Sequence, residues 1–279
     1  MDYTKELVPT PTDPTRSRAL EENEIANLLA SKFIARKDAK AQQYGDGIWM
    51  VHTKTGKRDG ERIPWRRADL LSHVRGDQTF GHYLLDESSS CKLIAFDVDL
   101  TKTGHLPVAW TESDELGEEE DLREAWLNRR HPARGFIKYQ FKLMANMLMS
   151  SCSAMLGAPP LAAAYSGGKG IHVYAFTGLI PAQDARDGAG IVLDNIGGFK
   201  ATRGENFFVH EQFPILSIEL FPKQGSLDGK DLGNLMRLPL GKNMKAPREP
   251  TFFIDMTSPV AEMVPTDPIK ALTAENPWE

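Results

Sequence analysis

The sequence predicts an α+β fold with a mostly antiparallel or mixed sheet. Two observations favour this class. Segments with strand character and segments with helical spacing follow one another without regular alternation, and several short strands are separated by turns rather than by helices. The 279 residues, 41% of them hydrophobic, suffice for one large domain or two modest ones with a sizeable core. The chain shows no internal repeat.

The N-terminal part predicts a helical and β layer over residues 18–88, preceded by a disordered lead over residues 1–17, which are polar and rich in proline. Apolar residues at helical spacing predict a helix over 19–33. The stretch GIWMVHT (47–53) predicts a strand, and WRRADLLSHVRG (65–76) predicts a short helix that ends at its glycine.

The rest of the chain predicts a core unit over residues 89–260 and a C-terminal tail over 261–279. The predicted core elements are two strands at 79–86 and 91–100 joined by the turn ESSS, a long helix at 134–156, two short strands around the glycine turn at 167–170, and strands within 213–224 and 233–241. All of this would form one compact domain overall.

Charge and composition exclude several classes of protein. No stretch approaches the roughly 20 apolar residues of a membrane span, and the N-terminus lacks the apolar segment of a secretory signal, so we expect a cytoplasmic protein without a membrane partner. Cys91 and Cys152 lack C-x-x-C spacing, which argues against a disulfide framework or a cysteine-built zinc site. The net charge of −5 depends on an acidic run at 112–124, interpreted as a solvated loop or helix start, so it neither supports nor excludes a nucleic-acid partner.

Two aspartates interrupt the apolar run CKLIAFDVDL (91–100). Side chains alternate across a strand, so Asp97 and Asp99 share one face while Phe96, Val98 and Leu100 share the other. Paired carboxylates of this kind are typical ligands of hard divalent cations such as Mg²⁺ or Mn²⁺. D-x-D alone also occurs in nucleotide-sugar glycosyltransferases, in nucleases and by chance on solvated strands.

A glycine-rich turn in YSGGKGIHVYAF (165–176) has the composition of a phosphate-binding loop. Glycines allow the backbone to approach a ligand closely, and exposed amides can bind phosphate oxygens. Lys169 adds a positive charge, and His172 shares a strand face with Tyr174 and Phe176. The Walker pattern is absent. The alternative is a plain hairpin with a surface lysine and a structurally satisfied histidine.

A third acid, Glu219, lies among apolar residues of the predicted strand in FPILSIELFPKQ (213–224), where an isolated carboxylate would be costly. It would be accommodated if it joined the two aspartates around metal. Lys223, Arg237 and Lys242 follow, with enough positive charge for a triphosphate or a nucleic-acid backbone. A structural ion pair between Glu219 and one of these bases is the alternative.

In this order, FDVD (96–99), SGGKGIH (166–172) and IELFPKQ (218–224) resemble the motifs of the archaeo-eukaryotic primase, or primase–polymerase, superfamily. Over about residues 70–245 the chain looks most like primases of phages, plasmids and other mobile elements, including those linked to CRISPR and conflict systems. The resemblance implies a primase–polymerase fold, with an RRM-like mixed or antiparallel catalytic sheet in 89–260 and the N-terminal layer packed on it.

The resemblance also implies roles for individual residues. Asp97, Asp99 and Glu219 would be catalytic and would bind two Mg²⁺ or Mn²⁺ ions. The residues expected to bind nucleotide are Ser166, Gly167, Gly168, Lys169, Gly170, His172, Lys223 and Arg237, the last two holding nucleotide or template. One departure is Gly170, because many members carry serine two positions before the motif histidine. The zinc-binding elements of several relatives have no counterpart, so we expect no zinc.

The activity implied is template-directed nucleotidyl transfer, that of a DNA primase and/or DNA polymerase. The expected partners are a single-stranded DNA template, a primer strand and dNTPs or NTPs, with a helicase or other replication or CRISPR proteins as further candidates. De novo priming and primer extension both stay open. Two alternatives are a non-catalytic nucleic-acid-binding module of the same fold and a D-x-D nucleotide-sugar glycosyltransferase.

Overall fold

The computed structural model describes residues 14–57, 60–101 and 122–278. The first thirteen residues of the expected lead and most of the acidic run lie outside these ranges. The helices are α1 (Pro14–Phe33), α2 (Arg67–Arg75), α3 (Leu122–Leu127), α4 (Arg134–Met155), α5 (Ala182–Ile196) and α6 (Pro268–Thr273). The strands are β1 (Ala41–Gln43), β2 (Trp49–Val51), β3 (Thr79–Tyr83), β4 (Ser90–Leu100), β5 (Leu161–Tyr165), β6 (Gly170–Pro181), β7 (Phe199–Ala201), β8 (Phe207–His210), β9 (Leu216–Phe221), β10 (Leu235–Arg237), β11 (Phe252–Ile254) and β12 (Pro265–Thr266).

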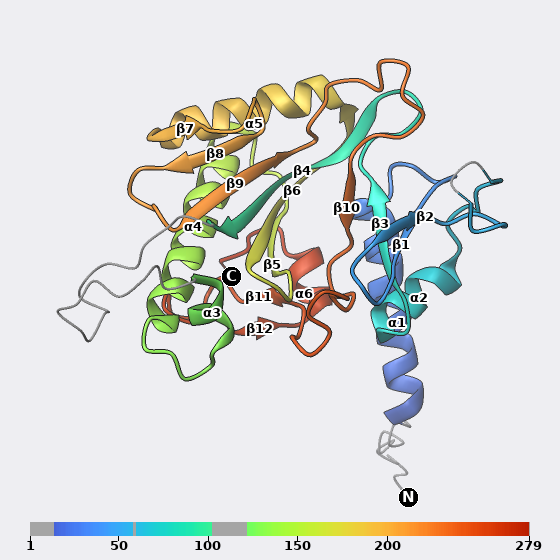
Figure 1. Cartoon of the computed structure of the whole chain (residues 1–279), viewed down its shortest axis with the longest axis horizontal. Coiled ribbons are helices and arrows are strands. Elements are labelled where there is room, and N and C mark those ends of the chain that lie inside the picture. Colours follow the sequence, from blue (N-terminus) through green and yellow to red (C-terminus); the bar gives the residue numbers. More distant parts are fainter. Residues whose placement is uncertain (1–13, 58–59, 102–121, 279) are drawn as a thin grey trace, which may run out of the picture.

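The strands form two sheets, and each described pairing is antiparallel, so the predicted α+β class is confirmed. The large sheet has the order β12-β11-β5-β6-β4-β9-β8-β7, and the small sheet has the order β10-β3-β1-β2. In Figure 1 the small sheet lies to the right of the large sheet. No helix in the described ranges has the length and apolar character needed to cross a bilayer.

The large sheet is built around β4, whose alternation separates a core face from a polar face. Phe96, Val98 and Leu100 are buried, whereas Asp97 and Asp99 are half-buried. Helices α4 and α5 pack against strands of this sheet and against each other, and their apolar side chains join the same core. The two aspartates therefore lie on the face that these helices leave open.

The small sheet differs from the expected arrangement. Strands β3 and β4 do not form a hairpin, because the turn between them carries the chain from the small sheet to the large one. Strand β10 then returns from the large sheet to pair with β3. Strand β10 thus belongs to the small sheet although it was expected in the core unit over 89–260, and its buried Met236 still packs in the main hydrophobic core.

The expected boundaries of the N-terminal lead and the C-terminal tail need correction. Helix α1 begins at Pro14, so residues 14–17 are helical rather than part of a disordered lead; proline is well tolerated in the first turn of a helix. The expected tail over 261–279 contains β12 and α6. Leu272 of α6 is buried, and the indole Nε1 of Trp278 donates a hydrogen bond to Asn146 Oδ1 at 3.0 Å, so this segment is anchored to the core.

The predicted helices α2 and α4 are confirmed, and Gly76 ends α2 in the left-handed conformation. Helix α5 was not predicted. It contains Gly188 and Gly190, which weaken a helical pattern, and it buries small residues such as Ala185 and Ala189 against its neighbours.

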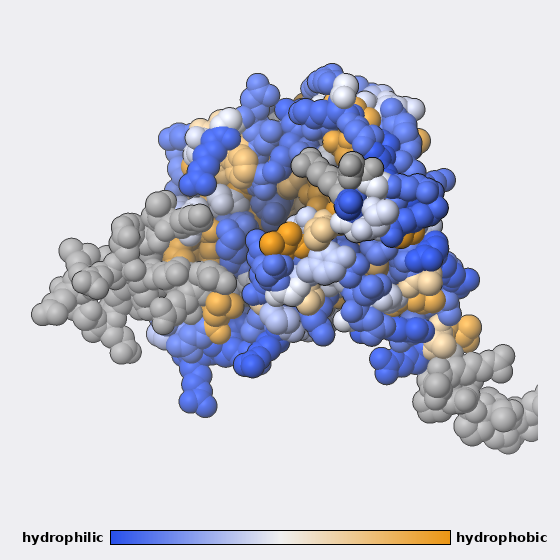
Figure 2. All heavy atoms as spheres, turned by 45° about the vertical axis from the view of Figure 1, so that its right-hand side comes forward, coloured by the Kyte–Doolittle hydropathy of each residue, from blue (hydrophilic) through white to orange (hydrophobic). Residues whose placement is uncertain are grey.

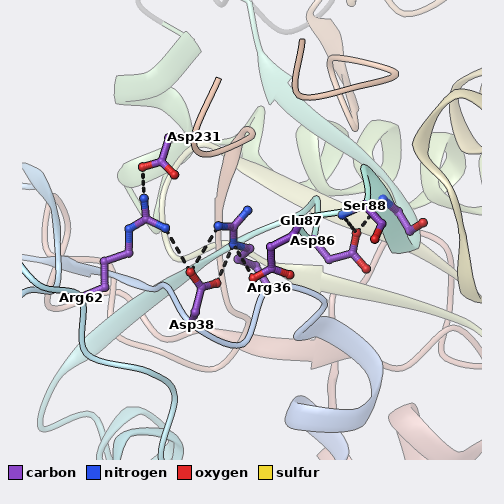
Figure 3. A network of polar contacts seen from close by, with 8 residues as sticks. Arg36, Asp38, Arg62, Asp86, Glu87, Ser88 and Asp231 are labelled. Carbon is purple, nitrogen blue, oxygen red and sulfur yellow. Dashed lines mark hydrogen bonds and ion pairs between the residues drawn. The ribbon is translucent and has the colours of Figure 1, made fainter. Parts of the chain in front are cut away.

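A charged network joins the N-terminal layer to the segment that follows β9 (Figure 3). Arg36, whose side chain is 6% exposed, contacts Asp38 at 2.6 Å and Glu87 at 3.3 Å. Arg62 pairs with Asp38 at 3.0 Å and also with Asp231. Burial opposes ionisation of Asp38, but the hydrogen bonds from both arginines lower its pKa to about 2. The network thus fixes the small layer against the connection that leads from β9 to β10.

Candidate active site

Three predicted site residues form one row across the centre of the large sheet. On β4, Asp97 lies opposite His172 of β6 on one side and opposite Glu219 of β9 on the other. Directly opposed residues in antiparallel strands point to the same face and lie about 5 Å apart. The fold therefore gathers three motifs that are distant in the sequence.

Asp99 occupies the next row on the same face, between Gly170 of β6 and Ser217 of β9. A Cβ atom at position 170 would overlap Asp99 Oδ1 and the backbone oxygen of Val98. Only glycine leaves room for the Asp99 carboxylate in this arrangement. The departure from the serine of many primases is therefore linked to the position of Asp99.

Each carboxylate has a partner of its own. Lys169 Nζ lies 2.8 Å from Asp99 Oδ2, Lys223 Nζ pairs with Glu219 Oε1, and His172 Nε2 lies 3.4 Å from Asp97 Oδ1. Within the described ranges, no three His, Cys, Asp or Glu side chains converge as a metal cage. Metal binding by these acids stays a prediction. Its support is the preference of divalent cations for carboxylate oxygens, and not a preformed site.

The surroundings of this row favour the neutral form of His172 and disfavour the ionised form of Asp97. Burial, and then the charges of Asp99 and Glu219, raise the pKa of Asp97 well above its ordinary value. Burial, with Arg237 nearby, lowers the pKa of His172 to about 3, so the imidazole is neutral near pH 7 and its contact with Asp97 is no ion pair. A 2.8 Å hydrogen bond between His172 Nδ1 and the Tyr174 hydroxyl fixes the ring.

The glycine turn is held from outside through its carbonyl oxygens. Arg237 Nη2 donates to the Ser166 carbonyl, and Asn243 Nδ2 donates to the Gly167 carbonyl at 3.1 Å. The Ser166 hydroxyl donates to the Gly170 carbonyl at 2.8 Å, which closes the turn. Gly167 has φ +66°, a left-handed conformation that favours glycine.

The middle of the turn is anchored in the same way. The Gly168 carbonyl accepts hydrogen bonds from Trp126 Nε1 at 2.8 Å and from the Tyr165 hydroxyl at 3.0 Å. The Lys169 carbonyl accepts from the Leu100 amide at 3.0 Å.

Three backbone N–H groups of the turn have no acceptor among the described residues. Among the described residues, none accepts a hydrogen bond from the backbone N–H groups of Gly167, Gly168 or Lys169. Successive backbone N–H groups in a turn can form a concave site for an anion. This arrangement favours a phosphate-binding loop over the plain hairpin alternative.

Ser166 and Arg237 both make hydrogen bonds to the glycine turn itself. The Ser166 hydroxyl donates to the Gly170 carbonyl, and Arg237, which is half-buried on β10, donates to the backbone carbonyl of Ser166. Both residues therefore shape the loop from within the protein, and direct contact of either with nucleotide stays a prediction.

Lys223 is placed beside Glu219 by aromatic side chains. Its Nζ lies 4.7 Å from the ring centre of Phe221 and 5.4 Å from that of Phe207. Phe207 lies directly opposite Glu219 in the sheet. These contacts hold the ammonium group over the same face as the acids.

Sequence reasoning missed Trp126, Asn243 and Phe207. No local sequence pattern indicates these three residues, because each comes from a segment that meets the site only in the folded chain. The alternation of β6 did predict that Tyr174 shares the strand face of His172.

The face turned forward in Figure 2 is mostly hydrophilic, with hydrophobic residues bordering a hollow near its centre.

Comparison with known proteins identifies the family. Over residues 26–266 the chain matches the family described as TOTE conflict system, Archaeo-Eukaryotic Primase domain. No curated protein matches the chain. The match confirms the resemblance drawn from the three ordered motifs, and it favours a nucleotidyltransferase superfamily over nucleotide-sugar glycosyltransferases. The chain belongs to the archaeo-eukaryotic primase domain family of TOTE conflict systems.

Proposed function

We propose that the protein catalyses template-directed nucleotidyl transfer, as a DNA primase and/or DNA polymerase that uses two Mg²⁺ or Mn²⁺ ions. The observation that carries this proposal is the row of His172, Asp97 and Glu219 beside a glycine turn whose amides at Gly167, Gly168 and Lys169 donate to none of the described residues. Acids that can bind metal and amides that can bind phosphate thus share one face of the sheet.

The donor set fits hard divalent cations. Asp97, Asp99 and Glu219 supply only carboxylate oxygens, the ligands that Mg²⁺ and Mn²⁺ prefer. Burial first, and then the charges of Asp99 and Glu219, raise the pKa of Asp97 despite Lys169 and Arg237, so a bound dication would stabilise its ionised form. When bound, the two ions would lower the pKa of the attacking hydroxyl and stabilise the departing pyrophosphate.

The residues of the chain would bind and orient the triphosphate. The amides of Gly167, Gly168 and Lys169 would donate to phosphate oxygens, and the Lys169 ammonium group would add charge. In the tautomer whose Nδ1 accepts from the Tyr174 hydroxyl, neutral His172 carries its proton on Nε2 and would donate a hydrogen bond without bringing a charge. Positioning of this kind supplies most of the catalysis in phosphoryl transfer.

The proposed partners are a single-stranded DNA template, a primer strand and dNTPs or NTPs. A helicase or another protein of the same conflict system is a further candidate, in keeping with the family description. A non-catalytic DNA-binding module is the second reading of the fold. The presence of all three acids on one face favours the catalytic reading.

The test is synthesis by the full chain on primed and unprimed single-stranded DNA, comparing dNTPs with NTPs and Mg²⁺ with Mn²⁺. We expect incorporation that Asp97→Ala and Asp99→Ala abolish without unfolding the protein. Asp194→Asn, on the exposed side of α5, is a matched control that should retain activity. Template binding without incorporation under either metal would overturn the proposal and favour the binding module.

A further inference from the structure

Two lysines cover the carboxylates that are expected to bind metal. Lys169 Nζ lies 2.8 Å from Asp99 Oδ2, and Lys223 Nζ pairs with Glu219 Oε1. The lysine side chains keep exposed fractions of 41% and 29%, so their amines lie at the open surface of the site rather than in the core.

Both lysine side chains are partly exposed, and the backbone of Lys169 is fixed. Lys169 belongs to the anchored glycine turn, where its carbonyl accepts from Leu100 at 3.0 Å. Lys223 is separated from the end of β9 by Pro222, and the rings of Phe221 and Phe207 lie 4.7 and 5.4 Å from its Nζ. Rotation about side-chain bonds alone can therefore move either amine toward the acids or away from them.

An ammonium group and a divalent cation compete for the same carboxylate oxygens. A bare dication that approaches Asp99 or Glu219 meets a positive charge already in place, and like charges at such distances repel strongly. An amine that has a phosphate oxygen as an alternative partner can leave the carboxylate at little cost, because a partly exposed ion pair contributes at most about 1 kcal/mol.

We propose that Lys169 and Lys223 act as internal counter-cations, which weaken metal binding in the nucleotide-free protein and move to the phosphates when nucleotide enters. Metal affinity then rises when nucleotide binds, so the empty enzyme holds its metal ions less tightly. The identity of the phosphate ligand rests on the function proposed above, whereas competition between lysine and metal does not.

The experiment is a Mn²⁺ titration of the nucleotide-free full chain, followed by electron paramagnetic resonance of free Mn²⁺. Lys169→Met and Lys223→Met should each tighten Mn²⁺ binding by about fivefold, the factor that corresponds to loss of one partly exposed ion pair. Lys169→Arg and Lys223→Arg keep the charge and should keep the weak affinity of the wild type. Lys200→Met is the matched control, because Lys200 pairs with Glu211 at 3.8 Å outside the site.

Circular dichroism establishes that each variant is folded, and Lys169→Gln and Lys223→Gln serve as second variants should a methionine disturb the site. Unchanged or weaker Mn²⁺ binding by the folded neutral variants would overturn the inference.

A second titration includes a non-hydrolysable dNTP analogue. The analogue should tighten Mn²⁺ binding in the wild type and do so less in the double methionine variant, because coupling between two ligands is reciprocal. Equal coupling in both proteins would contradict movement of the lysines to phosphate. If the neutral variants bind Mn²⁺ more tightly but the wild type never incorporates nucleotide, the proposed polymerase function is refuted while competition between lysine and metal is supported.

Discussion

Replacing Gly170 by alanine adds a single Cβ atom and so tests how closely the backbone of β6 approaches Asp99. The Cβ of Gly170→Ala would overlap the backbone oxygen of Val98 and the carboxylate of Asp99, and a backbone oxygen of a central strand cannot rotate away. Overpacking of this kind costs about 1–3 kcal/mol of unfolding free energy. Gly170→Ser adds the same Cβ, so the residue found in many primases should be destabilising in this chain.

Urea unfolding of the full chain measures the cost, and primer extension measures the effect on Asp99. Gly190→Ala is the matched control. Gly190 lies in α5 with no atom within 4 Å of the added Cβ, so alanine should be neutral or stabilising by up to about 1 kcal/mol. A Gly170→Ala protein that equals the wild type in stability and activity would refute the account of this position.

Three further changes probe single contacts. Trp126→Phe removes the indole donor to Gly168 and should raise the KM for nucleotide several-fold with little change in kcat, measured by steady-state incorporation. Asp97→Asn should abolish activity yet stabilise the metal-free protein at pH 7. Because the folded-state pKa of Asp97 is raised, that gain should vanish below about pH 4 in urea titrations. Asp38→Asn should lower stability at pH 7. Because Arg36 helps hold the folded-state pKa of Asp38 at about 2, the loss should shrink as the pH falls from about 4 toward 2.

The parts of the fold that the sequence predicted are those with a local signal. Alternation in 91–100 placed Asp97 and Asp99 on one face, and the apolar neighbours of Glu219 marked its strand. Helix α4 has a long apolar pattern and a glycine after its end. Each of these signals lies within a few residues of the feature that it predicts.

The parts that it missed depend on pairing between distant segments. Nothing near residues 235–237 indicates that they leave the core unit and pair with β3. The bonds from Trp126 and Asn243 to the glycine turn join positions far apart in the chain. Helix α5 contains two glycines, so its packing against the sheet and not its intrinsic propensity stabilises it.

The acids on one face of the large sheet are proposed to carry out nucleotidyl transfer. The most direct test is single-turnover incorporation on a primed template at saturating Mn²⁺, comparing the wild type with Asp99→Asn and Glu219→Gln. Metal ions contribute several kcal/mol to such reactions, and each 1.4 kcal/mol is tenfold in rate, so each change should slow incorporation at least about 100-fold. Incorporation at the wild-type rate by either variant would contradict the account.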